Sequence, residues 1–465
     1  MSTQGWLAVA VLIYLFVLLG LSLWSREKIR TEEDYLVAGR RLPTTLATFT
    51  LFATWFGAGT LMTATDEIRT EGLSVSVMEP YGAGLALIFA GLFFARPLWK
   101  MKLLTIGDFF RVRYGKRAEK VAVLAALPGF IGWIAVQLTA LSEILRLFFQ
   151  IPTATGILLS AFVSLIYTVM GGMWSVTLTD SMQLILVLVG LFELAYSVLT
   201  GVGGGVFSNG VTRILTENSS EILSFFPDTS FSGVLTIFGL FCVSALGNIP
   251  GQDLNQRIFA SKSASIARRA CIIAGVAYIV LGTIPVALAL SARIVLPEGF
   301  DGPTLPALAH LYLGPAMTVL FVLSLLSIIL STITSAILAP ASSLAHNVLS
   351  QWVSSQRGRI GLAKFSVVLI TSLSVIVAFL GPRMFELLEA SYTISFVALL
   401  SPLFAGLYLK RHAENSAILA MVTGFLVWSV EWFVETSFPM SLVAAAMSLC
   451  AYIFHAYVWL PRFKS

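Results

Sequence analysis

Residues 49–72 read FTLFATWFGAGTLMTATDEIRTEG, an apolar segment with Gly57 and Gly59 near its middle. The segment is long enough to cross a bilayer, but glycine weakens a helix because its backbone loses the most freedom on folding. Unwound backbone at membrane depth is tolerated where it lines a cavity enclosed by protein. We therefore expect a membrane helix that breaks at its centre and turns free backbone groups toward such a cavity.

A second interruption follows at residues 241–253, FCVSALGNIPGQD, where Gly247, Asn248, Pro250 and Gly251 cluster. Proline removes a backbone donor and opposes continuation of the helix. A pair of broken helices in corresponding halves of a membrane protein is typical of inverted-repeat secondary transporters. The alternative is two kinked helices that have no role in transport.

The composition shows which solvent these helices face. Of 465 residues, 57% are hydrophobic and 11% are charged, whereas soluble domains contain about 25% charged residues. A globule of this size cannot cover so many apolar side chains, which excludes a soluble enzyme, a disordered protein and a nucleic-acid-binding protein. Since a spanning helix needs about 20 apolar residues, we expect an all-α polytopic membrane protein with about 13 transmembrane helices. The predicted spans are 5–24, 43–69, 77–98, 120–149, 153–172, 176–200, 231–252, 269–292, 313–345, 363–380, 384–408, 415–435 and 439–460.

The basic residues favour one orientation of these spans. If the spans alternate in direction, the Lys and Arg residues fall on one side with five exceptions, which are Arg69, Arg146, Arg213, Arg293 and Arg383. Loops rich in Lys and Arg remain in the cytoplasm. We therefore expect a multi-pass protein of the plasma (inner) membrane, with its N-terminus outside and its C-terminus cytoplasmic.

A carboxylate and a group of hydroxyls stand inside predicted spans. Asp180 lies near the start of the span at 176–200, where a buried carboxylate is costly and is a functional candidate by default. The alternative is that Asp180 caps the start of its helix, where an acidic residue is favourable. Further along the chain, the span at 313–345 carries four hydroxyls within five residues, at Ser331, Thr332, Thr334 and Ser335.

These hydroxyls admit two interpretations. Serine and threonine in membrane helices often bond back to their own helix or join neighbouring helices. However, Na⁺ is a hard cation that prefers oxygen ligands, and the broken segment 49–72 can offer carbonyls. An alkali-cation site between the two segments is therefore physically reasonable.

The sequence offers little for enzymatic chemistry. Its three cysteines lie in apolar runs without a CxxC spacing, and its four histidines are scattered. No nucleophile and base stand in a recognisable arrangement. We therefore do not expect an enzyme.

Five segments, in order along the chain, carry the signatures of one family. They are DYLVAGRRLPTTLATFT (34–50), LTIGDFFRVRYGKR (104–117), GGMWSVTLTDSMQ (171–183), QRIFASKSASIARRA (256–270) and IILSTITSAILAPASS (328–343). Together they resemble the sodium/solute symporter family, whose members include proline, sodium/galactose and sialic acid transporters. The resemblance covers nearly the whole chain.

This resemblance implies a LeuT-type fold and Na⁺-coupled uptake by alternating access. Residues 1–465 would form a single transporter domain built on a five-plus-five inverted repeat. The expected parts are an extra N-terminal helix at 5–24, a first repeat at 43–200, an inverted second repeat at 231–408 and C-terminal helices at 415–460.

The resemblance also implies where the ions and the solute bind. The family's main Na⁺ site would fall on carbonyls and hydroxyls of Ala53, Phe56, Ile328, Ser331 and Thr332. The second Na⁺ site of some members would fall on Asp180, Ser331, Thr334 and Ser335. The substrate cavity would be lined by Trp55, Gly57, Thr60, Glu79, Gln137, Ser244, Asn248 and Glu389.

We therefore expect a symporter that uses Na⁺ as its coupling ion and has a small polar organic solute and membrane lipid, but no nucleic acid, as partners. Two candidate pocket carboxylates, Glu79 and Glu389, together with tryptophan and tyrosine, favour a cationic or zwitterionic solute such as an amino acid or amine. Gly247 aligns with the gating tyrosine of the family's sugar transporter, which disfavours a sugar. Two alternatives stay open: a proton-coupled transporter of the same fold, and a receptor of this fold that binds solute without moving it. The sequence does not indicate an oligomeric state.

Overall fold

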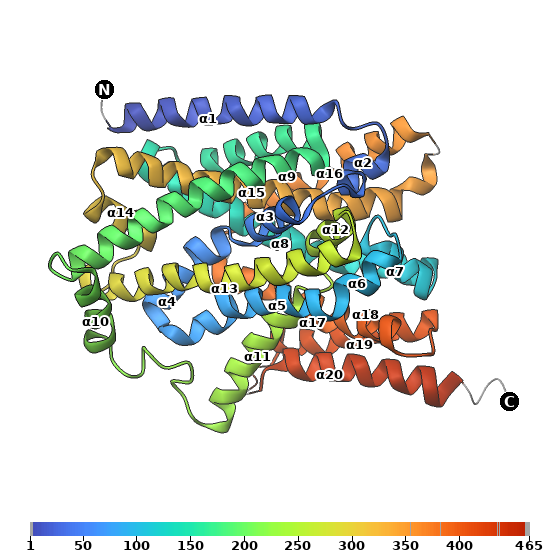
Figure 1. Ribbon diagram of the computed structural model, residues 1–465. Coiled ribbons are helices and arrows are strands. Elements are labelled where there is room, and N and C mark those ends of the chain that lie inside the picture. Colours follow the sequence, from blue (N-terminus) through green and yellow to red (C-terminus); the bar gives the residue numbers. More distant parts are fainter. Residues whose placement is uncertain (1–2, 354, 382, 435, 437, 461–465) are drawn as a thin grey trace.

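The computed structural model describes residues 3–460 apart from 354, 382, 435 and 437. Figure 1 shows long helices that lie side by side, with α1 along one edge of the bundle and α20 along the opposite edge. Within the described residues the regular elements are helices, and an isolated parallel bridge joins Leu42 to Ser261. The all-α prediction is confirmed.

The α-helices are α1 (Thr3–Arg26), α2 (Glu32–Val37), α3 (Thr44–Trp55), α4 (Thr65–Glu71), α5 (Ala83–Phe89), α6 (Ala95–Lys100), α7 (Ile106–Arg113), α8 (Lys116–Phe149), α9 (Thr153–Val202), α10 (Phe207–Glu217), α11 (Phe231–Gly247), α12 (Gln252–Ala260), α13 (Ala264–Val295), α14 (Thr304–Tyr312), α15 (Pro315–Ser343), α16 (Gln356–Phe379), α17 (Met384–Ala398), α18 (Leu400–Tyr408), α19 (Glu414–Trp428) and α20 (Met440–Ile453). Short 3₁₀ or π segments adjoin them at η1 (Ala38–Arg40), η2 (Gly59–Ala64), η3 (Leu73–Val77), η4 (Met78–Gly82), η5 (Ala90–Phe94), η6 (Leu344–Leu349), η7 (Ser350–Trp352), η8 (Ser429–Trp432) and η9 (Phe454–Trp459).

Eleven helices among the described residues are long and apolar enough to cross a membrane. Two further segments, Thr44–Trp55 and Gly59–Glu71, are bent by 50° at a short break and make a twelfth span when taken together. The eleven are Gly5–Ser25, Leu73–Lys100, Lys116–Phe149, Thr153–Met170, Gly172–Val202, Phe231–Ala260, Ala264–Val295, Pro315–Trp352, Arg357–Phe379, Met384–Tyr408 and Met440–Trp459. The polytopic membrane fold is therefore confirmed, together with the expected break in the second span.

The structure departs from the expected spans at residues 415–435. Here α19 has 15 residues and gives way to η8. The chain turns back at this point, where the Glu431 carboxylate accepts a hydrogen bond of 2.9 Å from the backbone N–H of Met440 at the start of α20. Taken alone, α19 is shorter than the roughly 20 residues that a spanning helix needs, so twelve of the thirteen expected spans meet the criteria of length and composition.

The long helix α9 contains two of the predicted spans. Gly172 divides them with φ 49° and ψ −150°, a backbone conformation that side chains with a Cβ rarely adopt. A Cβ at this position would also lie 2.6 Å from the backbone carbonyl oxygen of Tyr35. Glycine is therefore required where the two spans meet and where α2 crosses them.

Glycines also bring α5 and α13 into close contact. A Cβ on Gly84 would lie 2.5 Å from Ile279, and one on Gly275 would lie 2.6 Å from the carbonyl oxygen of Gly84. Membrane helices pack through such small residues because surrounding lipid provides no hydrophobic driving force. The contact sets Tyr278 of α13 beside Glu79 of η4.

The segments that carry or adjoin the basic loops 25–43 and 96–120 gather at one end of the bundle. In Figure 1, α2, α6 and α7 lie together on the right, whereas α4, α10 and α14 lie at the opposite end. We call the end with α2, α6 and α7 the basic end. The arrangement agrees with the expected alternation of spans, and the cytoplasmic location of this end stays a prediction.

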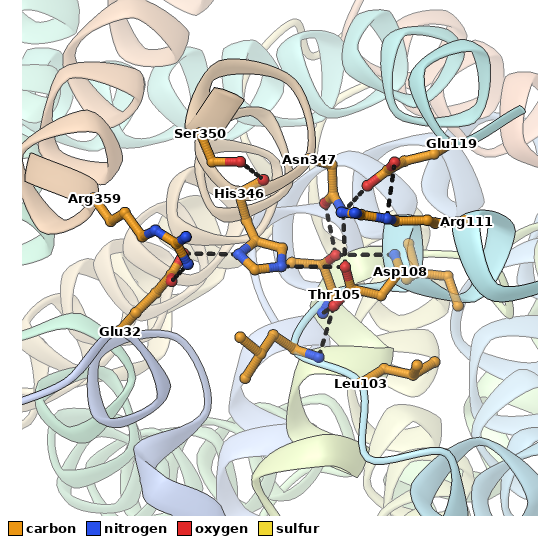
Figure 2. A network of polar contacts seen from close by, with 12 residues as sticks. Glu32, Leu103, Thr105, Asp108, Arg111, Glu119, His346, Asn347, Ser350 and Arg359 are labelled. Atoms are coloured by element: carbon orange, nitrogen blue, oxygen red, sulfur yellow. Dashed lines mark hydrogen bonds and ion pairs between the residues drawn. The ribbon is translucent and has the colours of Figure 1, made fainter. Parts of the chain in front are cut away.

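A polar network joins several helices at the basic end (Figure 2). His346 of η6 places Nδ1 2.7 Å from a carboxylate oxygen of Glu32 and Nε2 3.1 Å from a carboxylate oxygen of Asp108. Because carboxylates accept hydrogen bonds, both ring nitrogens donate only when the imidazole carries two protons. His346 in that form is a cation that holds α2 and α7 together at the end of α15.

Asn347, the next residue, extends this network to α8. Its amide nitrogen donates to Asp108 at 3.0 Å and to Glu119 at 2.8 Å. Its amide oxygen accepts a hydrogen bond of 2.6 Å from the hydroxyl of Thr105. Both polar atoms of this buried amide are therefore used, which fixes α7 and α8 against the end of α15.

The cations of the network lower the pKa of two carboxyl groups. Burial of Glu32 raises its pKa, but the hydrogen bonds and charges of His346 and Arg359 outweigh this effect and leave the pKa below its ordinary value. Burial also raises the pKa of Asp108. The hydrogen bond and charge of His346, together with hydrogen bonds from two backbone N–H groups, outweigh this effect and leave the pKa below its ordinary value. A carboxyl group whose pKa is lowered by folding stabilises the folded protein at pH values above its ordinary pKa. That stability is lost as the pH falls from the ordinary pKa through the lowered pKa.

Acid should therefore destabilise the basic end. We expect the melting temperature of the purified protein to fall as the pH decreases below about 5, because Glu32 and Asp108 then bind protons. Glu32→Gln should melt a few degrees lower at pH 7 and should lose less on acidification, because one of the two carboxylates no longer titrates. Glu221→Gln, which changes an exposed carboxylate in the loop before α11, is the matched control. If Glu32→Gln and the control lose the same stability between about pH 5 and pH 3, the network does not titrate as described.

Candidate sodium and solute sites

The break after α3 frees a backbone carbonyl. In an α-helix the N–H of Gly57 would donate to the carbonyl of Ala53, four residues earlier. Here it donates to Trp55 at 2.8 Å, and the next N–H, that of Ala58, donates to the side-chain oxygen of Gln137 at 2.9 Å. The Gln137 amide thus replaces a lost backbone partner, and the Ala53 carbonyl is available to another ligand.

The Ala53 carbonyl faces the hydroxyl of Thr332 in α15. The Thr332 hydroxyl lies 3.3 Å from the Ala53 oxygen and 3.2 Å from the carbonyl oxygen of Ile328. A Cβ on Gly57 would overlap this hydroxyl, so only glycine permits the approach of the two segments. Three oxygens expected at the main Na⁺ site therefore meet at one point.

The other two residues expected at this site lie next to these three. Phe56 follows the last residue of α3 with ψ of 59°, so its carbonyl no longer runs along the helix axis. Ser331 turns its hydroxyl to Asp180, at 2.5 Å from a carboxylate oxygen. Ser331 thus connects the main site to the buried carboxylate.

Asp180 is fully buried between three helices. Its second carboxylate oxygen accepts a hydrogen bond of 2.5 Å from the hydroxyl of Thr50 in α3. The helical segment that holds Asp180 begins at Gly172, more than two turns earlier. Asp180 is therefore too far inside the helix to cap its start, and the capping interpretation is wrong.

A buried arginine lies beside Asp180. Arg257 of α12 places Nη2 3.9 Å from the Asp180 carboxylate and 2.7 Å from the hydroxyl of Ser335. Its Nη1 donates to the backbone carbonyl of Asp253 at 2.8 Å. Two residues expected at the second Na⁺ site, Asp180 and Ser335, thus face a guanidinium group.

Thr334, the remaining residue expected there, turns elsewhere. Its hydroxyl donates to the carbonyl of Ser331 at 2.9 Å, and its side chain lines a separate cavity with Thr179 and Gln183. That cavity has a volume of about 10 Å³. The structure brings Asp180, Ser331 and Ser335 together and leaves Thr334 on another face of α15.

A second cavity lies where the break between α11 and α12 meets α8 and α17. Its volume is about 30 Å³, enough for about two water molecules. The lining residues are Gly129, Phe130, Trp133, Gly247, Asn248, Gly251, Asp253, Ser391, Tyr392 and Ser395. Aromatic rings and one carboxylate therefore surround a space of small volume.

Asp253 is the carboxylate of this cavity. Its side chain accepts a hydrogen bond of 2.5 Å from the indole nitrogen of Trp55, which ties the broken span of α3 to that of α11 and α12. Phe130 and Trp133 of α8 stand together with ring centres 6.2 Å apart. Of the residues expected to line the substrate cavity, Asn248 lines this one. Trp55 does not line it, but its indole donates the hydrogen bond to Asp253, which does.

Glu79 forms a separate cluster next to this cavity. Three hydroxyls reach its carboxylate, from Thr60 at 3.1 Å, Tyr278 at 3.0 Å and Tyr392 at 2.9 Å. Ser244 donates nearby to the carbonyl of Met78 at 2.7 Å. Glu79 thus bonds Tyr392, which lines the cavity, and is not itself among the lining residues. The expected contact of Glu79 with solute stays a prediction.

The remaining expected cavity residues are spread around the break. Gly57 has no Cβ, which leaves room for Thr332 beside the break. The side-chain oxygen of Gln137 accepts a hydrogen bond from the backbone N–H of Ala58 at the break. Glu389 lies on α17, two residues before Ser391 and three before Tyr392, and it is not among the residues that line the cavity. Its contact with solute stays a prediction.

Sequence reasoning missed Asp253 and Arg257. The span was expected to end at residue 252, which assigned both residues to a basic loop. Instead, every residue of α12 is buried, and Arg257 is 1% exposed. The signal was available in the sequence, because Asp253 stands two residues after the GNIPG break and Arg257 stands one helical turn further on.

A model of the sodium:solute symporter family matches residues 35–424, most of the chain. The protein belongs to this family. It is therefore a multi-pass membrane transporter rather than an enzyme, and Na⁺ is its coupling ion.

Known members of the family are similar to this symporter over most of its length. The high-affinity choline transporter 1 of Drosophila melanogaster is 26% identical over 432 residues, which cover 89% of this chain and 68% of that protein. The sodium/pantothenate symporter of Escherichia coli (strain K12) is 24% identical over 446 residues, covering 90% of this chain and 88% of the other. A solved structure of a Na⁺-coupled sialic acid symporter, substrate-bound and outward-open, superposes with a TM-score of 0.82 at 19% identity and covers 98% of both chains. The likeness confirms the LeuT-type fold.

The close fit of Gly57 to Thr332 gives a test of the main Na⁺ site in this symporter. In Gly57→Ala the new methyl group should displace the Thr332 hydroxyl, and Thr332→Ala should remove it. Loss of one oxygen ligand costs about 1.4 kcal/mol, so the Na⁺ concentration for half-maximal thermal stabilisation without solute should rise about tenfold in each variant.

Gly20→Ala is the matched control, because no atom lies within 4 Å of a Cβ at that position. It should leave the Na⁺ dependence as in the wild type. Unchanged Na⁺ dependence in folded Thr332→Ala would show that this hydroxyl is not a ligand.

Proposed function

We propose that the protein imports a small organic cation of the quaternary-ammonium class, to which choline belongs, together with Na⁺ by alternating access. The observation that carries the proposal is the Asp253 carboxylate in the cavity between the two broken spans. A buried carboxylate requires a positive partner, and an organic cation that enters this cavity would supply one.

The cavity walls suit the same class of solute. Phe130, Trp133 and Tyr392 line it alongside Asp253. Aromatic faces attract cations through the ring quadrupole, and quaternary ammonium groups, which donate no hydrogen bonds, depend on such faces. One carboxylate together with aromatic walls therefore matches a cation that carries methyl groups.

An anionic solute fits this cavity less well. Pantothenate and sialic acid, solutes of similar transporters, carry a carboxylate that Asp253 would repel. The buried cation nearby, Arg257, is already engaged by Ser335 and by the carbonyl of Asp253. The similarity to choline transporters supports the same choice, since choline is a permanent cation.

Alternating access follows from the small size of the cavity. About 30 Å³ holds about two water molecules and no organic solute, so binding must be accompanied by opening on one side. The network around His346 closes the basic end in the present arrangement. We propose that the opposite end admits Na⁺ and solute from outside and that the basic end releases them into the cytoplasm.

Transport and binding of choline test the proposal. In proteoliposomes, radiolabelled choline should accumulate under an inward Na⁺ gradient and not under a K⁺ gradient. In detergent, choline should raise the melting temperature in Na⁺, whereas its uncharged carbon analogue 3,3-dimethyl-1-butanol should not. Binding of choline without accumulation would identify a receptor, and equal binding of the uncharged analogue would exclude recognition of the cation.

Asp253→Asn should weaken choline binding strongly. Removing one member of a buried charge pair costs about 2 kcal/mol or more, which corresponds to about a 30-fold loss of affinity. Asp228→Asn, the same substitution in the exposed loop before α11, is the control and should bind choline like the wild type. Wild-type affinity in folded Asp253→Asn would contradict the assignment of Asp253.

A further inference from the structure

We propose that Glu79 holds a proton at neutral pH in the cation-free protein and releases it when Na⁺ binds at the break after α3, so that Na⁺ exchanges with a proton at the centre of the bundle. The inference rests on the proposed Na⁺ symport and adds a second ion to it. It starts from the surroundings of one buried carboxyl group.

Glu79 carries a charge that no described cation balances. Its side chain is 2% exposed and lies within the candidate span Leu73–Lys100. None of the ion pairs formed by the described residues includes Glu79. An ionised carboxylate is costly in such an interior unless a cation accompanies it, and an unpaired one takes up a proton instead.

The contacts between neighbouring oxygens agree with a proton on Glu79. The hydroxyls of Thr60 and Tyr278 both reach Glu79 and lie 2.5 Å from each other, and the Tyr278 hydroxyl also lies 3.0 Å from the carbonyl oxygen of Trp55. Each hydroxyl has a single hydrogen, so an ionised carboxylate leaves two hydrogens for these four contacts. A proton on Glu79 supplies a third. It permits a chain of donations from the carboxyl group through the two hydroxyls to the carbonyl of Trp55.

The helices packed against Glu79 bring no positive charge to it. Of the elements in contact with η4, neither η2, η3 nor α5 contains an ionisable side chain, and α11 contains Cys242 alone. On η4 itself, Tyr81 packs its ring against Phe225. The arginines of α13 stand two or more helical turns from Tyr278, at Arg268, Arg269 and Arg293.

The remaining neighbour of Glu79 leads to a second negative charge. Tyr392 of α17 donates to the other carboxylate oxygen of Glu79 at 2.9 Å. Tyr392 also lines the solute cavity, which contains the Asp253 carboxylate. Like charges disfavour ionisation of both groups, so Asp253 adds to the preference of Glu79 for its protonated form when no cation is bound.

Tyr278 connects Glu79 to the main Na⁺ site. The carbonyls of Ala53 and Phe56, expected at that site, flank Trp55, whose own carbonyl the Tyr278 hydroxyl reaches. The ring of Tyr278 also meets that of Phe56 edge to face, with ring centres 5.3 Å apart. A Na⁺ ion at the break would therefore bring a positive charge next to this chain of hydroxyls, where it favours the ionised form of Glu79.

The exchange keeps the charge of the interior constant. As Na⁺ enters, the O–H bond of the Glu79 carboxyl group breaks, its electron pair stays on the carboxylate, and the proton passes to water. Because linkage is reciprocal, a protein that loses a proton on binding Na⁺ also binds Na⁺ more tightly as the pH rises. The affinity levels off at pH values where the cation-free protein no longer holds the proton.

Proton release by the purified wild type tests the inference. In weakly buffered detergent with a pH indicator and without solute, NaCl should release about one proton per bound Na⁺, whereas KCl should release none. The Na⁺ concentration for half-maximal thermal stabilisation should fall by about tenfold for each unit of rising pH near neutrality.

Glu79→Gln copies the shape of the protonated side chain but has no proton to lose. It should bind Na⁺ without releasing protons, and its Na⁺ dependence should be the same at each pH. Glu221→Gln, the same substitution at an exposed position before α11, is the matched control and should release protons like the wild type. A purely structural role of Glu79 would change the melting temperature but would not alter the number of protons released.

Two results would overturn the inference. Na⁺ binding by the wild type without proton release, and with equal affinity from about pH 6 to about pH 9, would show that no proton is exchanged. This measurement decides the question even if Glu79→Gln does not fold. Undiminished proton release by folded Glu79→Gln would place the proton on another group. Absence of Na⁺ binding by the wild type at every pH would instead contradict the proposed function, so the two failures are distinguishable.

Discussion

The carbonyl of Ala53, left without its helical N–H partner at the break after α3, is the constraint around which the site is built. In a membrane interior such a group has no water to bond, so protein or an ion must satisfy it. Gly57 makes the break sharp enough for α15 to bring Thr332 to this carbonyl, and Gln137 bonds the neighbouring N–H. The bundle around the break serves to hold a few backbone oxygens where a cation can use them.

A small number of buried ionisable side chains lie around this break. Asp180, Asp253 and Arg257 are all buried, and each has a hydrogen bond or ion contact that reaches another helix or the backbone. Buried ions are tolerated when they are paired, and breaking such a pair is strongly unfavourable. Under the proposed function, the binding of Na⁺ and of an organic cation would become part of the charge balance of the fold, which would give a physical basis for coupling the two.

The two ends of the bundle have different tasks. At the basic end His346 and Asn347 bind carboxylates and a hydroxyl from segments far apart in sequence, which closes that end through contacts that water or acid can break. In the centre, the cavity beside Asp253 has a volume of only about 30 Å³, so the described arrangement leaves no room there for an organic solute. Alternation between ends requires that such polar networks exchange partners while the helices themselves stay intact.

The sequence by itself determined the membrane setting, the break at Gly57 and Gly59, and the hydroxyls of α15, because hydrophobic length, glycine and clustered oxygens are local properties. It also selected Asp180, since a carboxylate within an apolar span needs a reason. Only the tertiary structure decided what those groups contact. From the sequence, Asp253 and Arg257 were assigned to a basic loop. The structure shows that both lie on α12, whose residues are all buried. Glu79 suggested a solute contact, and only the structure showed that hydroxyls of Thr60, Tyr278 and Tyr392 reach its carboxylate. The partner of a buried charge is set by helix packing over hundreds of residues, and no local pattern in the sequence encodes it.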